Sequence, residues 1–489
     1  MNILMVTSEA APFAKSGGLA DAVSALAGAL KRLGHDVRVV LPRYYSVDKS
    51  GLEALPGPLG VPMGSGEQWS GVYRGILPGL DVPVYFIEHE AYFGREGLYG
   101  SRSESDYSDN PRRFSFFSRA AFQLCRKLGW VPDVFHAHDW PTGLVPVYRR
   151  FAEAGTEFSR SATVFTIHNL GYQGVYAKEN FPYFGLPWEL YHGAGLEYHG
   201  ALNLLKTGLA SADRLSTVSP SYAREIQTPE LGQGLDGLLR HRSADLVGIL
   251  NGVDTDEWNP ATDKRLPARY SAADLSGKAQ CKTALQKAFG LEERPDVPLI
   301  GMVTRLADQK GVGELFGPAH GSAVPICRDM DIQFVVLGSG DAWCEAELRT
   351  LSGRLPNFRA RIGYSEDLAH LVEAGSDFFL MPSRYEPCGL NQMYSLRYGT
   401  LPIVHRTGGL ADTVSNYDQD SGSGTGFMFD HLSPRSIYDT VGWAVWAYYN
   451  KREHVRGMIR RAMAQEFSWD RSAREYERLY SDALAAIRR

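Results

Sequence analysis

The strand–glycine–helix–strand pattern of the first 42 residues limits the fold more than any other feature of the chain. Residues 2–7 (NILMVT) form an apolar run typical of a buried strand, and 36–42 (DVRVVLP) form a second one. Between them, after Gly17-Gly18, apolar side chains recur at the helical period until Gly34, a natural helix stop. Such a unit opens a doubly wound parallel sheet, so we expect an α/β protein.

Further apolar runs of strand length follow in two series. The first series comprises 84–87, 133–138, 162–168, 214–219 and 246–252, and the second comprises 298–303, 332–338, 377–382 and 401–405. The stretch between the two series is polar and has no sustained apolar period. We therefore predict two Rossmann-like doubly wound domains facing a central cleft, over 1–256 and 298–465, a linker region over 257–297, and a C-terminal helix (466–489) that packs back on the N-terminal domain.

Polar residues gather where the predicted strands end. Ligands of open α/β sheets bind beyond the carboxyl ends of the strands, so we expect these residues to share one site in the cleft. They are Lys15, His138-Asp139, His168-Asn169, Asn251, Arg305, Glu386 and Thr407.

A glycine pair stands before a predicted helix in each half of the chain, in KSGGLADAV (15–23) and in RTGGLADTV (406–414). Two glycines let bare backbone N–H groups approach an anion at a helix start, and Lys15 adds a positive charge to the first loop. The alternative is a tight strand-to-helix turn with a surface lysine. We expect the two loops, the second with Thr407 and Gly408, to close on one ligand from opposite sides of the cleft.

Two other loops carry charged residues of a kind that suits a nucleotide sugar. In TRLADQKG (304–311), Arg305 and Lys310 suit a diphosphate leaving group without the help of a metal; the alternative is two solvated surface cations. In SRYEPCGLNQ (383–392), Pro387 disfavours helix at Glu386, and the backbone of Cys388, Gly389 and Leu390 offers N–H donors at a helix start. The Glu386 carboxylate suits sugar hydroxyls, or else caps the helix.

No metal site is predicted. HAHDW (136–140) and TIHN (166–169) bring three histidines and Asp139 to two strand ends, but we expect His136 and His138 on opposite faces of their strand. The D-x-D pattern at 254–256 recurs at 329–331 and 418–420, so it carries no weight. We expect His168 to point into the cleft rather than into the core.

Composition excludes several classes of protein. Apolar residues make up 44% of the chain and the net charge is −5, which excludes the basic face of a nucleic-acid-binding protein. Five scattered cysteines without C-x-x-C exclude a disulfide framework or a zinc finger and suit a reducing compartment. Neither a signal peptide nor an apolar run of membrane-spanning length is found. We expect a cytoplasmic protein without a membrane partner, or a stromal one if a plastid transit peptide has been removed.

Together the motifs resemble those of glycosyltransferase family five, the bacterial glycogen synthases and plant starch synthases. They run in family order along almost the whole chain. The matching segments are KSGGLADAV, GREGLYG (94–100), VFHAHDW, TIHNLGYQG, STVSPSYA (216–223), GILNGVDTDEWNP, TRLADQKG, VVLGSGD (335–341), IGYSEDLAH (362–370), SRYEPCGLNQMYSLRYGTLPIVHRTGGLADTV and FSWDRSA (467–473).

This resemblance implies a B-type glycosyltransferase fold and transfer of glucose from ADP-glucose to the non-reducing end of an α-1,4-glucan, with retention of configuration and no cofactor. It assigns His168, Arg305, Lys310 and Glu386 to catalysis. On the donor side it assigns Lys15, Gly17, Gly18, Asn251, Tyr364 (against the adenine), Cys388, Gly389, Leu390, Thr407 and Gly408. Toward the acceptor it assigns Glu9, Tyr99 and Asp139.

Some positions depart from the pattern. Tyr394 stands where the related E-x7-E motif has a second acid, Ser16 and Asn391 replace commoner threonines, and 312–330 contains glycines and two prolines where relatives carry an amphipathic helix. Two alternatives remain: a related retaining transferase using UDP-glucose or a small acceptor, and a catalytically silent glucan-binding protein. The silent protein would have lost charges at Lys15, Arg305, Lys310 or Glu386, and all four are present.

Overall fold

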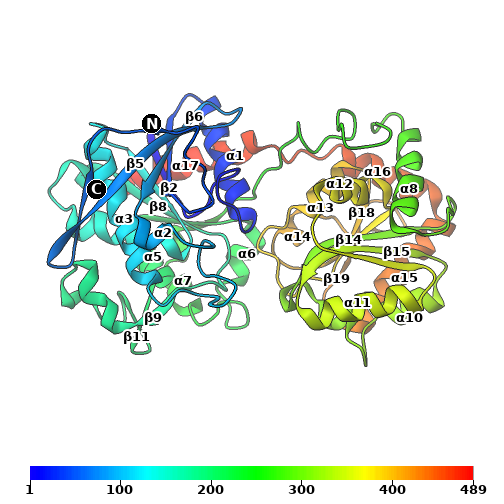
Figure 1. Cartoon of the computed structure of the whole chain (residues 1–489). Coiled ribbons are helices and arrows are strands. Elements are labelled where there is room, and N and C mark those ends of the chain that lie inside the picture. Colours follow the sequence, from blue (N-terminus) through cyan, green and yellow to red (C-terminus); the bar gives the residue numbers. More distant parts are fainter. Residues whose placement is uncertain (488–489) are drawn as a thin grey trace. The chain divides into compact units, whose positions relative to one another are not determined.

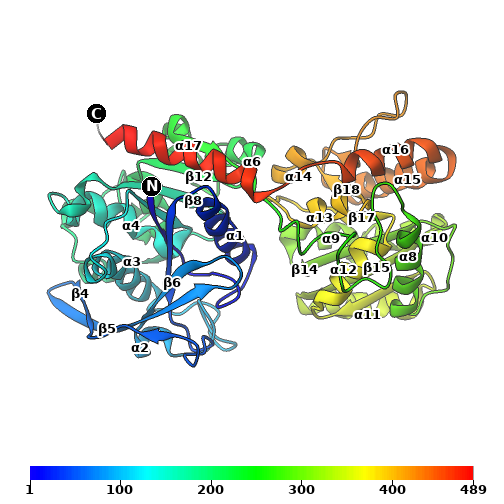
Figure 2. The same ribbon diagram turned by 90° about the horizontal axis from the view of Figure 1, so that it is seen from above.

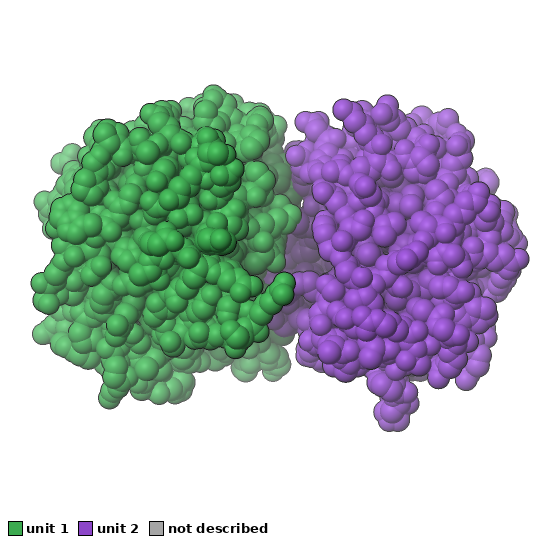
Figure 3. Space-filling model, in the orientation of Figure 1, with its two compact units in different colours: residues 1–252, 469–489 green, residues 253–468 purple. Residues whose placement is uncertain are grey.

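The computed structural model describes residues 1–487, and the chain divides into two compact units, coloured separately in Figure 3. Unit 1 comprises Met1–Gly252 and helix α17 (Trp469–Ile487), and unit 2 is Val253–Ser468. The segment 257–297 is therefore not a linker but part of unit 2. It contains helix α8 (Ser276–Phe289), which packs against α12 (Glu366–Gly375). Two buried lysines, Lys278 and Lys282, interrupt the apolar face of α8 and hid its helical period.

The main sheet of unit 1 is parallel over seven strands and then continues as an antiparallel edge. Its order is β13-β12-β8-β7-β1-β2-β6-β5-β3, and β4 pairs with β5. The parallel strands are β1 (Asn2–Val6), β2 (Asp36–Pro42), β6 (Val82–Glu88), β7 (Val134–His138), β8 (Ala162–Ile167), β12 (Arg214–Thr217) and β13 (Leu246–Gly248); the antiparallel ones are β3 (Glu53–Ala54), β4 (Leu59–Met63) and β5 (Gly66–Leu77). The antiparallel edge was not predicted, because exposed polar residues along β5 leave it no apolar run.

Helices and short strands complete unit 1. Val23, Leu26 and Leu30 of α1 are buried, as their spacing predicts. Helix α17 packs beside α1 and against β8 (Figure 2). The helices are α1 (Gly18–Arg32), α2 (Glu90–Phe93), α3 (Asn110–Lys127), α4 (Leu144–Val147), α5 (Leu204–Ser211), α6 (Pro220–Glu225) and α7 (Asp236–His241); β9 (Val175–Ala177), β10 (Glu197–Tyr198) and β11 (Ala201–Asn203) form a small antiparallel sheet.

Unit 2 is built on one fully parallel sheet in the order β16-β15-β14-β17-β18-β19. Its strands are β14 (Leu299–Leu306), β15 (Gln333–Gly340), β16 (Phe358–Ile362), β17 (Phe378–Met381), β18 (Leu401–His405) and β19 (Phe427–Phe429). Sequence reasoning missed β16, where two arginines interrupt the apolar residues, and β19, which has only three residues.

Helices cover both faces of this sheet. In Figure 1, α12, α13 (Asn391–Arg397) and α16 (Arg452–Met463) lie above it, and α10 (Ala323–Asp329), α11 (Ala342–Arg354) and α15 (Pro434–Asn450) lie below. Helix α14 (Gly408–Thr413) follows β18. The segment 312–330 forms two short helices, α9 (Val312–Phe316) and α10, instead of one long helix, in keeping with its glycines and prolines.

Each sheet has one point where the strand order reverses. In unit 1 the reversal lies between β1 and β7, and in unit 2 between β14 and β17. Ligands of doubly wound sheets bind outside the carboxyl ends of the strands at such points. Glu9 follows β1, Asp139 follows β7, Arg305 lies near the end of β14, and Glu386 follows β17, so predicted site residues stand at both reversals.

Two further findings concern membrane-spanning helices and the cysteines. None of the helices described between residues 1 and 487 is long and apolar enough to cross a membrane. All five cysteines are buried free thiols.

The packing of α17 on unit 1 gives the first testable prediction. Tyr480 is fully buried, and its hydroxyl lies 2.9 Å from Nδ1 of His136. Tyr480→Ala should lower the free energy of unfolding by about 3–5 kcal/mol, as for other buried aromatic residues. Asp470→Ala, on the same helix, removes only an exposed ion pair with Arg32 and should cost less than about 1 kcal/mol. Urea denaturation measures both, and equal effects would contradict the docking of α17.

Candidate active site

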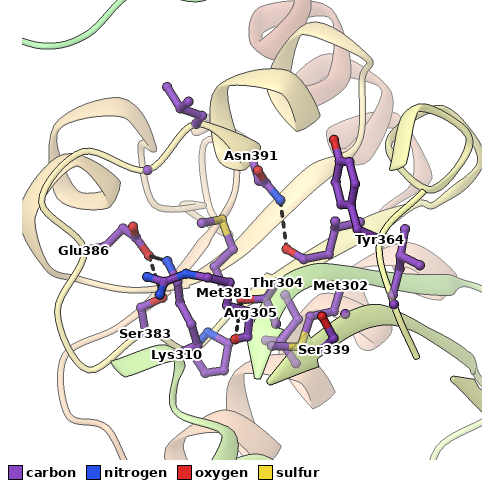
Figure 4. A pocket seen from close by; sticks show the side chains of 18 residues that line it. Met302, Thr304, Arg305, Lys310, Ser339, Tyr364, Met381, Ser383, Glu386 and Asn391 are labelled. Carbon is purple, nitrogen blue, oxygen red and sulfur yellow. Dashed lines mark hydrogen bonds and ion pairs between the residues drawn. The ribbon is translucent and has the colours of Figure 1, made fainter. Parts of the chain in front are cut away.

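A pocket of about 380 Å³ lies at the carboxyl ends of β14 and β17 in unit 2 (Figure 4). Its volume falls in the range of small-molecule sites in proteins. Six of the predicted site residues line it: Arg305, Lys310, Tyr364, Glu386, Gly389 and Leu390. Residues that sequence reasoning did not assign to the site also line it, among them Met302, Ser339, Ser383 and Asn391.

An ion pair joins the two loops that form the pocket. Lys310 Nζ lies 2.6 Å from Glu386 Oε2, and the Ser383 hydroxyl donates to the same oxygen at 2.8 Å (Figure 4). The Glu386 side chain is only 7% exposed, and a buried carboxylate needs such partners to remain charged. Gly311 lets the loops meet, because its φ is +68° and a Cβ there would lie 2.0 Å from the Pro382 carbonyl oxygen.

Arg305 supplies a second positive charge to the pocket. Its side chain is exposed, and among the described residues its guanidinium forms no ion pair. Tyr364 is 73% exposed and also lines the pocket. A cavity with one compensated and one uncompensated cation favours an anion, and an accessible aromatic ring favours a flat ring system beside it.

The second glycine pair packs against the loop that contains Glu386. The Gly409 N–H donates to the carbonyl of Glu386 at 3.0 Å. A Cβ on Gly408 would lie 1.9 Å from the Glu386 carbonyl oxygen, and one on Gly409 would lie 1.9 Å from that of Cys388. Cys388, Thr407 and Gly408 do not line the pocket. The two glycines are required because backbone packs directly on backbone at both positions.

In unit 1 the first glycine loop is held by a carboxylate of the chain itself. Glu9 Oε2 accepts hydrogen bonds from the N–H groups of Ser16 (2.6 Å) and Gly17 (3.3 Å). Its Oε1 accepts from the hydroxyls of Ser16 (2.7 Å) and Tyr99 (2.6 Å). Burial raises the pKa of Tyr99 well above its usual value, so its hydroxyl stays a donor. The Gly17 N–H, one of the two expected to bind an anion of the ligand, is therefore bound to Glu9.

Lys15, the cation expected beside that loop, lies on the surface. Its side chain is 52% exposed and forms an ion pair with Asp21 at 2.8 Å. Gly18 begins helix α1, as predicted for the residue after the loop. Asn251, at the other side of the sheet beyond β13, is buried.

Asp139 and His168 meet at the ends of β7 and β8. Asp139 has a φ of +55°, unusual for a non-glycine residue, and its Oδ1 accepts the N–H groups of His168 (2.7 Å) and Asn169 (3.4 Å). Burial raises the Asp139 pKa to about 7 and lowers the His168 pKa to about 3. The His168 ring is therefore neutral at pH 7 and is suited to hydrogen bonding with hydroxyls.

The expectation that His136 and His138 face opposite sides of their strand is wrong. Residues two apart on a strand share a face, and the two ring centroids lie 4.0 Å apart. His136 places its ring nitrogens 2.9 Å from the Tyr480 hydroxyl and 2.6 Å from the Thr166 hydroxyl, while His138 Nδ1 lies 3.1 Å from His168 Nε2. His136 thus forms its hydrogen bonds within the core, and the separate contact between His138 and His168 helps to orient His168.

Comparisons with known proteins agree with this arrangement. Residues 2–241 match the sequence model of the starch synthase catalytic domain, and 285–456 match that of glycosyl transferases group 1. The chain is 59% identical to a glycogen synthase of Treponema denticola, over 99% of both chains. It is 51% identical to glycogen synthase 1 of Geobacter metallireducens, over 99% of this chain and 96% of the relative. The chain belongs to the glycogen and starch synthase family of glycosyltransferases.

A solved structure of this family has the same fold. It is the catalytic domain of starch synthase IV from Arabidopsis thaliana, bound to ADP and acarbose, with 34% identity and a TM-score of 0.89 over 99% of both chains. The sucrose-phosphate synthase of Thermosynechococcus elongatus, at 16% identity and a TM-score of 0.61 over 99% of both chains, shares the fold alone. The two α/β units of this family member are thus the two Rossmann-like domains of the B-type glycosyltransferase fold.

Three features of the site were not predicted from the sequence, and only Ser383 had a usable signal. Ser383 follows β17 almost directly, so the strand-end rule could have found it. Asn391 begins helix α13 and donates to the Val303 carbonyl at 2.8 Å, a contact with no local signal. The clamp of Glu9 on the first glycine loop is likewise invisible in the sequence, because a carboxylate seven residues away can point in many directions.

The contrast between the two glycine pairs yields a prediction about stability. Gly409→Ala places a methyl group against the Cys388 backbone, so it should destabilise the protein by about 1–3 kcal/mol, as overpacking does. Gly17→Ala adds a methyl group with nothing within 4 Å, at a φ of −159° that any residue adopts. Its free energy of unfolding should stay within about 0.5 kcal/mol of the wild type. Chemical denaturation of both variants tests this, and a costly Gly17→Ala would refute it.

Asp139 gives a prediction about pH. Its pKa is about 7 in the folded chain and about 3.9 in an unfolded one. Between these values the folded state holds a proton that the unfolded state releases, so this residue makes the protein less stable as pH rises from 4 to 7.

Asp139→Asn keeps an oxygen for the two N–H groups but has no charge to bury. Relative to wild type, its free energy of unfolding should therefore increase with pH, by at most about 1.4 kcal/mol per unit up to pH 7, and then level off. Urea denaturation from pH 4.5 to 8.5 measures the difference, in which the histidines common to both proteins cancel. A difference that does not depend on pH would contradict a raised Asp139 pKa in the folded protein.

Proposed function

We propose that this protein transfers glucose from ADP-glucose to the non-reducing end of an α-1,4-glucan, with retention of configuration. The observation that carries the proposal is the pocket at the reversal of the unit 2 sheet, where Arg305 and Lys310 stand beside Glu386 and beside Gly389 and Leu390, which precede helix α13. The relatives named glycogen synthase, and the starch synthase structure with bound ADP and acarbose, support it.

The two cations act on the leaving group. As the bond between C1 of glucose and the phosphate oxygen breaks, the electron pair moves to the diphosphate, and Arg305 and Lys310 stabilise the added charge. Glu386, whose carboxylate also accepts the Ser383 hydroxyl, holds the Lys310 ammonium in place before the donor binds. The backbone of Gly389 and Leu390, on the opposite loop, supplies uncharged donors. Because fixed cations perform this task, we propose that the transfer needs no metal or other cofactor.

We propose that uncharged side chains hold the sugar. The neutral ring of His168 and the amide of Asn251 suit the glucosyl hydroxyls, because neither brings a net charge to an oxocarbenium-like carbon. We propose that the acceptor hydroxyl attacks C1 on the face that the diphosphate leaves. Its proton passes to the departing phosphate oxygen, which accounts for retention without a carboxylate nucleophile.

Glu9, Tyr99 and Asp139 are proposed to form the acceptor side. Glu9 lies beyond β1 and Asp139 beyond β7, while Tyr99, in the loop after α2, donates its hydroxyl to Glu9. A glucan is neutral and is bound through such hydrogen bonds rather than through a basic surface, in agreement with the net charge of −5. The five free thiols favour the cytoplasm as the compartment.

Measuring incorporation of labelled glucose into glycogen tests the function. The purified protein is incubated with glycogen and either ADP-glucose or UDP-glucose labelled in the glucosyl group. Faster incorporation from ADP-glucose is expected. Faster incorporation from UDP-glucose would overturn the donor assignment, and no incorporation from either by folded protein would favour a silent glucan-binding protein.

Lys310→Ala tests the role of the cations. Removing one well-placed electrostatic donor costs about 2.7–4 kcal/mol of transition-state stabilisation, so kcat should fall by 10²–10³-fold. Lys287→Ala is the matched control, since Lys287 is 63% exposed on α8, pairs with Glu293 at 3.3 Å and does not line the pocket. Steady-state kinetics with ADP-glucose and glycogen measure both. A Lys310→Ala enzyme within three-fold of wild type would remove Lys310 from the reaction.

A further inference from the structure

Unit 2 contains a second cluster of ligating groups that the proposed reaction does not use. One carboxylate oxygen each of Glu257 and Glu366 and one ring nitrogen of His370 all lie within 4.8 Å of one another. Glu257 belongs to the segment before α8, whereas Glu366 and His370 lie one helical turn apart on α12. None of the three lines the pocket at the ends of β14 and β17.

His370 has an unused nitrogen in a buried place. Its side chain is fully buried, and Nδ1 lies 2.7 Å from Oδ2 of Asp263, itself 1% exposed. The carboxylate holds the proton on Nδ1, so Nε2 carries a lone pair. Within residues 1–487, Nε2 is buried and has no hydrogen-bond partner. An unsatisfied buried acceptor is costly, and a carboxylate on the other nitrogen is the usual second partner of a metal-binding histidine.

The imidazole is also fixed in orientation. Trp258 stacks on the His370 ring with centroids 3.7 Å apart and on Tyr394 at 3.8 Å, with interplanar angles of 14° and 7°. Tyr398 donates its hydroxyl to Asp263 Oδ2 at 2.7 Å, which holds the carboxylate in turn. The ring therefore keeps Nε2 in one direction without rearrangement on binding, as a preorganised ligand does.

The two glutamates lie close enough to repel each other. One carboxylate oxygen of Glu257 lies within 4.8 Å of one of Glu366. The only cation at this position in the described residues is Arg265, whose Nη2 lies 3.2 Å from Glu366 and 3.6 Å from Glu257. Arg265 also contacts Asp367 at 3.4 Å. One positive charge thus faces three carboxylates, so a divalent cation would compensate the remaining negative charge.

We infer that Glu257, Glu366 and His370 bind a divalent transition-metal ion of the zinc class. One imidazole and two carboxylates suit zinc, whereas magnesium and calcium take oxygen ligands alone. Three protein ligands leave a fourth position for water. The ion joins the segment of Glu257 to α12 and so stabilises unit 2. It takes no part in glucosyl transfer, which the proposed function assigns to the residues of the pocket.

Metal titration of the full-length protein without an affinity tag tests the site. The protein is stripped with a chelator, dialysed and titrated with ZnCl2 by calorimetry, and separately with Co²⁺ by visible absorption. We expect one Zn²⁺ per chain, a Co²⁺ spectrum of low coordination number, and a rise of Tm with Zn²⁺. Because His370 is buried in a stack, its replacement endangers folding, so the variants change the glutamates, which are 41% and 48% exposed.

Glu257→Gln/Glu366→Gln should weaken Zn²⁺ binding at least ten-fold and abolish the rise of Tm. Asp367→Asn is the matched control, since Asp367 is the next residue on α12 and its carboxylate contacts Arg265 without belonging to the cluster; its Zn²⁺ affinity should equal that of wild type. Circular dichroism establishes that each variant is folded. Absence of Zn²⁺ binding by the wild type, or equal binding by the double variant, would overturn the inference.

Discussion

The ion pair between Lys310 and Glu386 is the interaction on which the pocket depends. It joins the loop after β14 to the loop after β17, where the strand order of the unit 2 sheet reverses. Both side chains are largely buried, so neither can lose the other without leaving an uncompensated charge. The pair places a cation at the sheet edge before any ligand binds, and backbone packing of Gly408 and Gly409 keeps the second loop in position.

Unit 1 uses buried carboxylates in a comparable way. Glu9 accepts backbone N–H groups of the first glycine loop, and Asp139 accepts those of residues 168–169. Each carboxylate follows a strand at the reversal of the sheet and ties the loop of a neighbouring segment. In both units, therefore, acidic residues at strand ends shape the loops, and the groups available to a ligand are those that remain.

Much of this could be predicted from the sequence, for reasons that particular residues make clear. The parallel strands are apolar runs, and the strand-end rule together with the charged loop 304–311 correctly predicted that Arg305, Lys310 and Glu386 share one pocket. Helix α8 was missed because its buried Lys278 and Lys282 reach distant carbonyl oxygens, such as those of Ala374 and Val297. Likewise, the link between Asp263 and His370 spans 107 positions, and no local pattern reports a contact over that separation.

The two GGLAD segments show which properties follow from the local sequence and which depend on the tertiary structure. By itself the sequence determined that each glycine pair follows a strand and starts a helix, because apolar periodicity and glycine placement are local properties. Only the tertiary structure decided what surrounds them. A Cβ at Gly17 would meet no atom within 4 Å, whereas one at Gly409 would lie 1.9 Å from a backbone oxygen. The same short sequence thus lies in a loop held by a carboxylate in one unit and in a tightly packed backbone in the other, because the residues that surround it belong to other segments of the chain.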